Sequence, residues 1–219
     1  MNSTGASTYN CGNRVSWISV GFATPSYQEA LPSCPQPATV TRSRLPFDAH
    51  PARSERQQLL NAYRDEVTLP HGDRGTYEWV QVPDQVRVAA FVSGGLLVIE
   101  QYHYLTGQMW QLPGGAVDPA DGGSRTAAQR ELAEETGYLA GRWSDKGSLY
   151  ALPGLTPARV HLWSTIDPTP SDAAPEPAEA DLEVRHITLD EALLAVRDGR
   201  LRCAASAALV MMLSLERRP

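Results

Sequence analysis

The chain has 219 residues, of which 42% are hydrophobic, so it can bury one ordinary core and still carry an extension. A formal net charge of −6 argues against a nonspecific nucleic-acid binder, and no apolar run approaches the length of a membrane span. Three widely spaced cysteines exclude a disulfide framework and the lack of a Gly-Lys-Ser/Thr sequence excludes a P-loop, so we expect a reduced, cytoplasmic protein that binds neither nucleic acid nor membrane.

The N-terminal part of the chain divides into two predicted segments. Residues 1–45 are rich in Ser, Thr, Pro and Asn and show no clear periodicity, which indicates an extension. In residues 46–84, a short helix is predicted at 52–63, and residues 76–82 alternate as a strand does. We expect the main domain to occupy residues 85–219.

The main domain mixes strands and helices. Apolar strands are predicted at 86–92 and 96–100, joined as a hairpin by Ser-Gly-Gly. The later elements expected in chain order are strands at 109–112, 148–152, 158–164 and 182–187, a proline-rich acidic loop at 167–180, and helices at 124–136, 188–198 and 204–215. Because there is no regular βαβ alternation, the predicted fold class is α+β, a mixed sheet flanked by helices.

Two of the predicted helices have capping residues at both ends. Ser124 is predicted to cap the first helix and Gly137 to end it in the left-handed conformation. Thr188 and Glu191 form a capping-box pattern at the start of the second helix, and Gly199 follows its end.

Three glutamates carry the chemistry of the first helix. Glu131, Glu134 and Glu135 stand at i, i+3 and i+4, so their carboxylates project from one helix face. Three like charges on one turn need a cation, and hard oxygen donors suit Mg²⁺ or Mn²⁺ better than zinc. A Gly/Pro-rich turn at residues 112–119 can bring its backbone close to a ligand. An acidic helix face alone is usually solvated surface, but its combination with this turn favours a metal site.

Residues 115–138 resemble the Nudix box of the Nudix hydrolases, G-x5-E-x7-R-E-U-x-E-E-x-G-U, where U is aliphatic. The matching residues are Gly115, Arg130, Glu131, Leu132, Glu134, Glu135 and Gly137. Asp121 replaces the first Glu, eight residues instead of seven separate it from Arg130, and Tyr138 replaces the last aliphatic residue. The extra residue falls at 122–123, before the helix, where it can bulge without rotating the glutamates.

Weaker similarities over residues 76–213 resemble the ADP-ribose pyrophosphatase branch. They are Leu-Val-Ile-Glu-Gln-Tyr at 97–102, Leu-Pro-Gly-Gly at 112–115, Pro-Gly at 153–154 and Asp-Leu-Glu-Val at 181–184. Two positions depart from the branch: His103 stands where an arginine usually follows Gln-Tyr, and Ala158 stands where a Glu often follows Pro-Gly. The resemblance implies an α/β/α sandwich and a homodimer.

The resemblance also implies an activity. A Mg²⁺- or Mn²⁺-dependent hydrolase would cleave ADP-ribose, or a related nucleoside-diphosphate-linked compound, to AMP and a phosphorylated moiety. Divalent cations neutralise the diphosphate oxygens that repel the attacking water. The implied ligands are Glu131, Glu134, Glu135 and the carbonyl of Gly114, although Glu134 could instead orient water. Arg130 would hold the carboxylates in place, unless it is only a surface pair with Glu134.

The general base in the branch comes from the loop before the last strand. Glu179 is our preferred residue because flanking Pro and Ala allow that loop to close, and Glu176 and Asp181 are the alternatives. All three can also be read as solvated loop charges.

Three further residues are candidate substrate contacts. Trp79 could stack on the base or could instead be a core tryptophan. We expect Tyr77 and Trp79 to lie on opposite faces of their strand, so that only one of them can face a ligand. His103 could contact phosphate in place of the missing arginine. Gly115 lies in the turn that can approach the substrate.

Other functions remain open. A nucleoside triphosphate sanitiser is usually shorter, and a non-catalytic Nudix sensor usually loses box glutamates, whereas Glu131, Glu134 and Glu135 are all kept here. An isomerase of isoprenoid diphosphates would need a reactive cysteine near the site, and Cys203, in the predicted C-terminal helix, is a poor candidate. A specialised NAD-derived substrate is also compatible with the changed positions.

Overall fold

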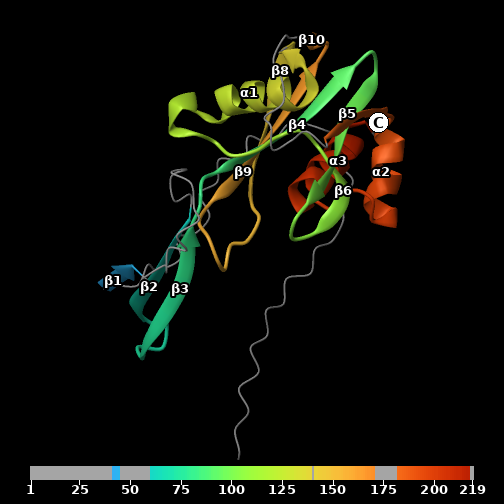
Figure 1. Cartoon of the computed structure of the whole chain (residues 1–219). Helices are drawn as coiled ribbons and strands as arrows, with labels where there is room; N and C mark the ends of the chain where they lie inside the picture. The colour runs from blue at the N-terminus through green and yellow to red at the C-terminus, as the bar shows by residue number, and fades with distance from the viewer. Residues whose placement is uncertain (1–40, 45–59, 140, 171–181, 218–219) are drawn as a thin grey trace, which may run out of the picture. The chain divides into compact units, whose positions relative to one another are not determined.

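The computed structural model describes residues 41–44, 60–139, 141–170 and 182–217 (Figure 1). The elements in these ranges are β1 Thr41–Arg44, β2 Asn61–Thr68, β3 Arg74–Gln81, β4 Gln85–Val92, β5 Gly95–His103, β6 Gly107–Gln111, η1 Pro119–Asp121, α1 Ser124–Thr136, β7 Tyr138–Leu139, β8 Arg142–Tyr150, β9 Arg159–Ile166, β10 Thr169–Pro170, β11 Glu183–Ile187, α2 Leu189–Asp198 and α3 Ala204–Glu216.

A mixed sheet forms the centre of the main domain. Among the described residues its strand order is β11-β5-β4-β9-β8, with β6 paired to β5 as a sixth strand. β4 and β9 run parallel, whereas the other neighbouring strands are antiparallel. The predicted hairpin is confirmed, and its turn places Ser93 and Gly94 at positive φ, 49° and 81°.

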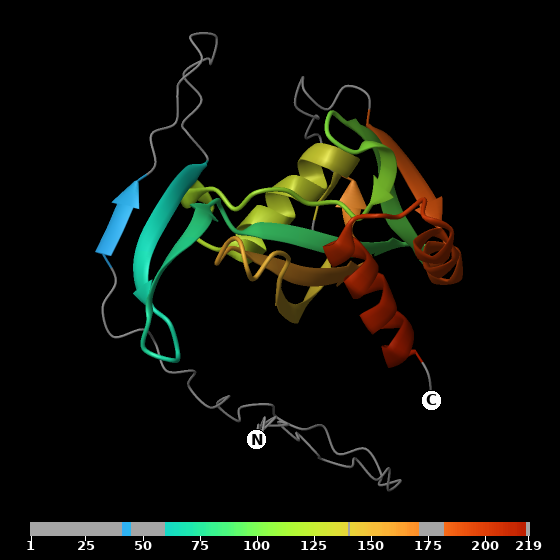
Figure 2. The ribbon, with the colours of Figure 1, turned by 90° about the horizontal axis from the view of Figure 1, so that it is seen from below.

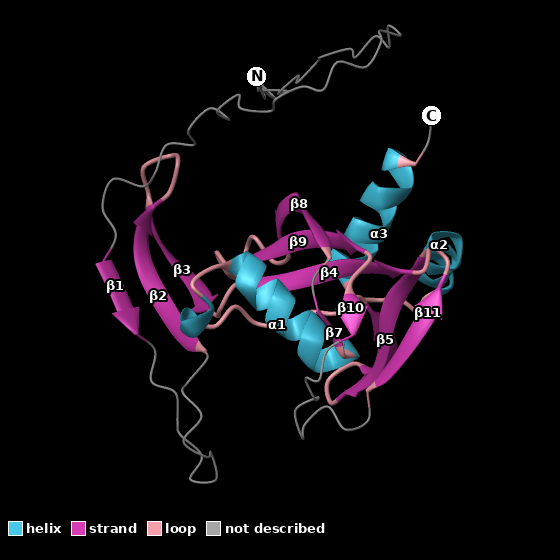
Figure 3. Ribbon diagram, turned by 90° about the horizontal axis from the view of Figure 1, so that it is seen from above, coloured by secondary structure: helices cyan, strands magenta, loops and turns pink. Residues whose placement is uncertain are grey.

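Helices cover both faces of this sheet. Val86 and Val88 of β4 pack in a buried cluster with Ala128 of α1, while Ala89 belongs to the cluster that contains α2 and α3. From below, α3 lies in front of the sheet and α1 behind it; from above, α1 lies in front (Figures 2 and 3). Alternating side chains of a buried strand thus face two helical layers, which confirms the predicted α/β/α sandwich.

The N-terminal strands form a sheet of their own. β2 pairs with β3 over eight residue pairs, and β1 adds to the other side of β2. The helix predicted at 52–63 is therefore wrong at residues 61–63, where pairing with β3 overrides local helix preference. Residues 52–59 lie outside the described part of the chain. β1 falls within the predicted extension, whose other residues are also outside it.

The helix ends are mostly as predicted. Gly137, at φ 71°, ends α1, and Gly199, at φ 82°, ends α2. The Thr188 side chain caps α2. The prediction for Ser124 is wrong, because Ser124 is the first helical residue and Gly123 is the N-cap, without a side-chain hydrogen bond. None of the helices in the described ranges is long and apolar enough to cross a membrane.

Candidate active site

The turn at Gly114 and Gly115 runs against β4 more closely than a side chain would allow. Gly114 has φ 140°, and a Cβ there would lie 2.2 Å from the carbonyl oxygen of Val86. Hydrogen bonds from the Val86 amide to the Gly115 carbonyl (2.9 Å) and from the Val88 amide to the Pro113 carbonyl (2.8 Å) hold the turn on the strand. Glycine is therefore required at position 114.

Two glutamates of α1 meet this turn on its other side. Glu135 is 4% exposed and accepts a hydrogen bond from the Gly114 amide at 2.6 Å. Glu131 is 8% exposed and lies so close to Gly115 that a Cβ there would be 2.5 Å from its Oε1. The i, i+4 spacing puts both carboxylates on the buried face of the helix. The sequence-predicted pair is thus brought together with the turn.

Arg130 connects the helix to the preceding loop. Its guanidinium donates to both carboxylate oxygens of Asp121, each at 3.0 Å, and to the Ala116 carbonyl at 2.9 Å. It also donates to Glu131 at 3.0 Å and Glu134 at 2.9 Å. The pair with Glu134 is therefore only one of several contacts that Arg130 makes, and Glu131 is also among its partners.

Asp121 is positioned by the same contact, despite the extra residue before α1. Its side chain is 6% exposed. The hydrogen bonds from Arg130 outweigh burial and hold the pKa of the Asp121 carboxyl below its ordinary value. In turn, the hydrogen bonds to Asp121 are the largest cause that raises the pKa of Arg130. The bidentate pair therefore fixes the loop to the helix.

The residue types at the site fit a hard divalent cation, since Glu131, Glu134 and Glu135 all supply carboxylate oxygens. In the described ranges, however, no group of three His, Cys, Asp or Glu side chains is arranged to hold an ion. The carboxylates are held instead by Arg130 and the Gly114 amide. The carbonyl of Gly114, an implied metal ligand, accepts a hydrogen bond from the buried side chain of Arg87.

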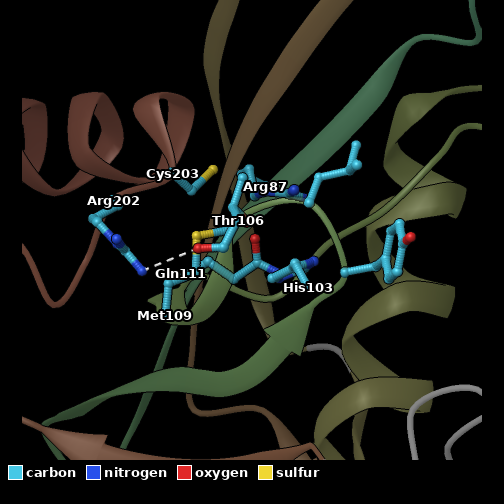
Figure 4. A pocket seen from close by; sticks show the side chains of 9 residues that line it. Arg87, His103, Thr106, Met109, Gln111, Arg202 and Cys203 are labelled. Atoms are coloured by element: carbon cyan, nitrogen blue, oxygen red, sulfur yellow. Dashed lines mark hydrogen bonds between the residues drawn. The ribbon is translucent and has the colours of Figure 1, made fainter.

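Sequence reasoning missed Arg87. This residue lies in β4, is 9% exposed, and also donates to the Val86 carbonyl at 2.9 Å. The available signal was a single charge within the apolar run 86–92. Arg87 lines a cavity of about 750 Å³ together with the predicted phosphate contact His103 (Figure 4). Cys203 lines the same cavity as the N-cap residue of α3, so its place in the sequence was a poor reason to dismiss it.

Asp84 and His161 were missed as well. The Asp84 carboxylate lies 2.9 Å from His161 Nε2 and accepts the Arg159 amide at 2.9 Å. Its backbone carbonyl accepts the amide of Val117, which follows the Gly-rich turn. Burial raises the pKa of Asp84, but the hydrogen bonds from Arg159 and His161 outweigh it and leave the pKa below its ordinary value. Asp84 therefore connects His161 of β9 to the loop that contains Val117.

Trp79 lies at a second cavity, of about 290 Å³, beside the loop at residues 153–157. Tyr77 lines the same cavity, so the prediction that the two side chains lie on opposite faces of the strand is wrong: residues two apart in a strand share a face. The Trp79 ring stacks on Tyr63 at 4.6 Å and its Nε1 donates to Asp65 at 3.0 Å.

The three candidates for the general base cannot be placed beside these groups. Glu176, Glu179 and Asp181 all lie outside the described residues.

A model of the NUDIX domain matches residues 83–204, which is more than half of the chain, so the chain belongs to the Nudix family of pyrophosphohydrolases. An ADP-ribose pyrophosphatase from Bacillus subtilis (strain 168) is 28% identical over 162 residues, covering 73% of this chain and 87% of the relative. A methanol dehydrogenase activator from Bacillus methanolicus is 29% identical over 155 residues, covering 69% and 83%. The crystal structure of an ADP compounds hydrolase shares the fold, with a TM-score of 0.69, 20% identity, and coverage of 84% of this chain and 95% of that one.

Gly115→Ala should lower kcat by about a hundredfold, because the new methyl group displaces the Glu131 carboxylate from the turn. The fold should persist, as judged by circular dichroism. Gly95→Ala is the matched control, since its Cβ would meet its nearest atom, the Val92 carbonyl oxygen, at an ordinary 3.5 Å. A wild-type rate in Gly115→Ala would show that the position of Glu131 does not matter.

Asp121→Asn should reduce the free energy of unfolding at pH 7 by about 1–3 kcal/mol, because one partner of the bidentate pair loses its charge. The pKa of Asp121 is lowered on folding, so its stabilisation is present above the ordinary aspartate pKa of about 3.9 and is lost as pH falls through the folded value. Urea denaturation of both proteins from pH 7 to pH 3 measures this. A difference in stability that does not shrink in acid would contradict the assignment.

Proposed function

We propose that this protein is a Mg²⁺- or Mn²⁺-dependent pyrophosphohydrolase. Its substrate is ADP-ribose or a related nucleoside-diphosphate-linked compound, and its products are AMP and a phosphorylated moiety. The observation that carries the proposal is the burial of Glu131 and Glu135 against the Gly114–Gly115 turn in a box that keeps all three glutamates. The ADP-ribose pyrophosphatase among the relatives supports the substrate class.

The chain supplies the ligands and their supports. A bound divalent cation would neutralise the diphosphate oxygens and favour attack by water. Glu131, Glu134, Glu135 and the Gly114 carbonyl are the groups that would hold it. The Gly114 amide fixes Glu135, and Arg130 restrains Glu131 and Glu134, so the carboxylates are oriented before the substrate arrives.

The proton that water loses must go to a base, and we assign this role to Glu179, with Glu176 and Asp181 as alternatives. His103 is the proposed phosphate contact, and Gly115 brings backbone close to the diphosphate. Trp79, beside the smaller cavity, is the proposed stacking surface for the base, and a homodimer would allow a partner to supply it.

Catalysis separates this function from a ligand sensor, and the products separate it from a triphosphate sanitiser. The purified protein with Mg²⁺ should convert ADP-ribose or a related compound to AMP and a phosphorylated moiety, identified by mass, and EDTA should abolish turnover. The panel should include NAD⁺, NADH, nucleotide sugars and oxidised nucleoside triphosphates. Pyrophosphate release from triphosphates alone would refute the ADP-ribose assignment, and no turnover at all would favour the sensor.

Glu135→Gln should reduce kcat to less than about a tenth of wild type, because it removes a ligand charge but almost no volume. The amide oxygen can still accept the Gly114 hydrogen bond, so thermal unfolding should change little. Glu183→Gln is a suitable control, because this exposed glutamate pairs with Arg185 on β11. Retention of more than a tenth of kcat would remove Glu135 from the metal site.

A further inference from the structure

The larger cavity is lined by cationic and neutral side chains. It lies between the β5–β6 turn and the segment joining α2 to α3 (Figure 4). Arg87 and Arg202 contribute guanidinium groups, and none of the described residues that line it is acidic. In a chain of net charge −6 this is a local excess of positive charge. Its volume, about 750 Å³, is within the range of small-molecule sites.

Arg87 is a buried cation, 9% exposed. Its guanidinium donates to the backbone carbonyls of Val86 and Gly114 and interacts with the Cys203 thiol, and no ion pair joins it to a carboxylate in the described ranges. Its Nε has no hydrogen-bond partner among the described residues, and neither has Nε2 of His103. A buried cation is unfavourable unless an anion pairs with it, so the Arg87 guanidinium favours an acidic ligand.

Arg202 holds one wall of the cavity in place. Its guanidinium donates to the carbonyls of Thr106 (3.3 Å) and Gln108 (2.6 Å), which joins the β5–β6 hairpin to the start of α3. Carbonyl oxygens satisfy its hydrogen bonds but leave its charge uncompensated. The cavity therefore has one cation that holds its wall and another, Arg87, whose Nε has no hydrogen-bond partner among the described residues.

Cys203 is the group lining the cavity that could otherwise supply negative charge. Burial raises the pKa of its thiol, but the charge of Arg87 and hydrogen bonding with Ser206 and with Arg87 outweigh burial, so the pKa lies below its ordinary value. The thiol thus senses Arg87, and its reactivity provides a measure of what occupies the cavity.

We propose that this cavity is a second anion site, which binds an acidic group on the half of the substrate beyond the diphosphate. This inference rests on the proposed function, in which the diphosphate itself is neutralised at Glu131, Glu134 and Glu135. Gly114 joins the two sites, because its carbonyl accepts from Arg87 while its amide donates to Glu135. The substrate class is a nucleoside diphosphate linked to a moiety with its own carboxylate or phosphate.

Matched substrates test the assignment. UDP-glucuronate differs from UDP-glucose by a carboxylate, and ADP-ribose phosphorylated on its terminal ribose differs from ADP-ribose by a phosphate. Wild type should favour the acidic member of at least one pair by about tenfold or more in kcat/KM. Arg87→Met keeps an unbranched side chain as far as the position of Nε but removes the charge, and it should reduce the ratio to below about twofold, whereas Arg87→Lys should retain part of it. Equal kcat/KM within both pairs in wild type would overturn the proposal.

A control variant and a folding check accompany these measurements. Arg142→Gln removes an exposed arginine that pairs with Asp167 on the sheet edge, and it should keep the wild-type ratio. Loss of the ratio in Arg142→Gln would mean that net charge, and not the cavity, sets selectivity. If Arg87→Met does not fold, Arg87→Lys still tests the proposal. Lysine keeps the charge but loses the fork geometry of arginine, so the ratio for Arg87→Lys should lie below that of wild type.

Alkylation of Cys203 by uncharged iodoacetamide tests binding without turnover. Trypsin cleaves after Arg202, so the modified peptide begins at Cys203 and is distinguished by mass from those of Cys11 and Cys34. Inorganic phosphate and UDP-glucuronate should each slow alkylation several-fold, compared with chloride at equal ionic strength and with UDP-glucose. Arg87→Met should remove this protection.

The outcomes separate the two proposals. If no substrate is hydrolysed but UDP-glucuronate protects Cys203 through Arg87, the proposed function fails and the anion site stands. If phosphate protects while the acidic substrates gain no advantage in either assay, the site takes a free anion and the assignment to the substrate is wrong. If nothing slows alkylation of wild type, the Cys203 thiolate is itself the countercharge of Arg87 and the proposal is overturned.

Discussion

The contact of the Gly114–Gly115 turn with β4 on one side and α1 on the other is the constraint on which the site depends. Neither position has room for a Cβ: at 114 the obstacle is the Val86 carbonyl, and at 115 it is the Glu131 carboxylate. Because the backbone of the turn contacts both the β4 backbone and the α1 carboxylates directly, the amide and carbonyl groups of the turn position the glutamates. The amide of Gly114 fixes Glu135, and its carbonyl meets Arg87. A rigid sheet strand thereby sets the place of the glutamates.

Clustered carboxylates on one helix repel each other, and the positive charge of Arg130 offsets this repulsion. Arg130 contacts Glu131 and Glu134 on its own helix and is itself held by Asp121 from the loop. The bidentate pair matters more than a surface i, i+4 pair would, since Asp121 is almost fully buried and Arg130 is about two-thirds buried. The face of α1 that meets the sheet carries small side chains, Ala127 and Ala128, which let the helix lie close to β4.

Periodicity and capping predicted most of the main domain, because those signals are local. The hairpin of β4 and β5, the glycine ends of α1 and α2, and the glutamate face all follow from spacing along the chain. The helix expected at 52–63 failed at its end because an eight-residue ladder with β3 decides the structure of residues 61–68, and such pairing is invisible in the local sequence.

At the site, the residues that could not be predicted are those whose role depends on contacts between distant parts of the chain. Arg87 is a single charge in an apolar strand, and only the tertiary structure shows that it is buried beside the Gly114 carbonyl and Cys203. The same holds for Asp84 and His161, 77 positions apart. A box motif identifies candidate ligands on one helix, but it does not identify the residues that pack around the Gly114–Gly115 turn.

The two sides of the Gly114 peptide separate the residues of the proposed metal chemistry from those of the proposed second anion site. On the α1 side, the residues match the family pattern, including Glu131, Glu134 and Glu135. On the side of the larger cavity, His103 replaces the usual arginine, yet Arg87 places a guanidinium at the same cavity from a different strand. A positive charge is thus present, but it reaches the cavity from β4 instead of β5. Since selectivity depends on where a charge lies as much as on its sign, such a relocation would alter which substrate half is accepted and leave the carboxylates untouched.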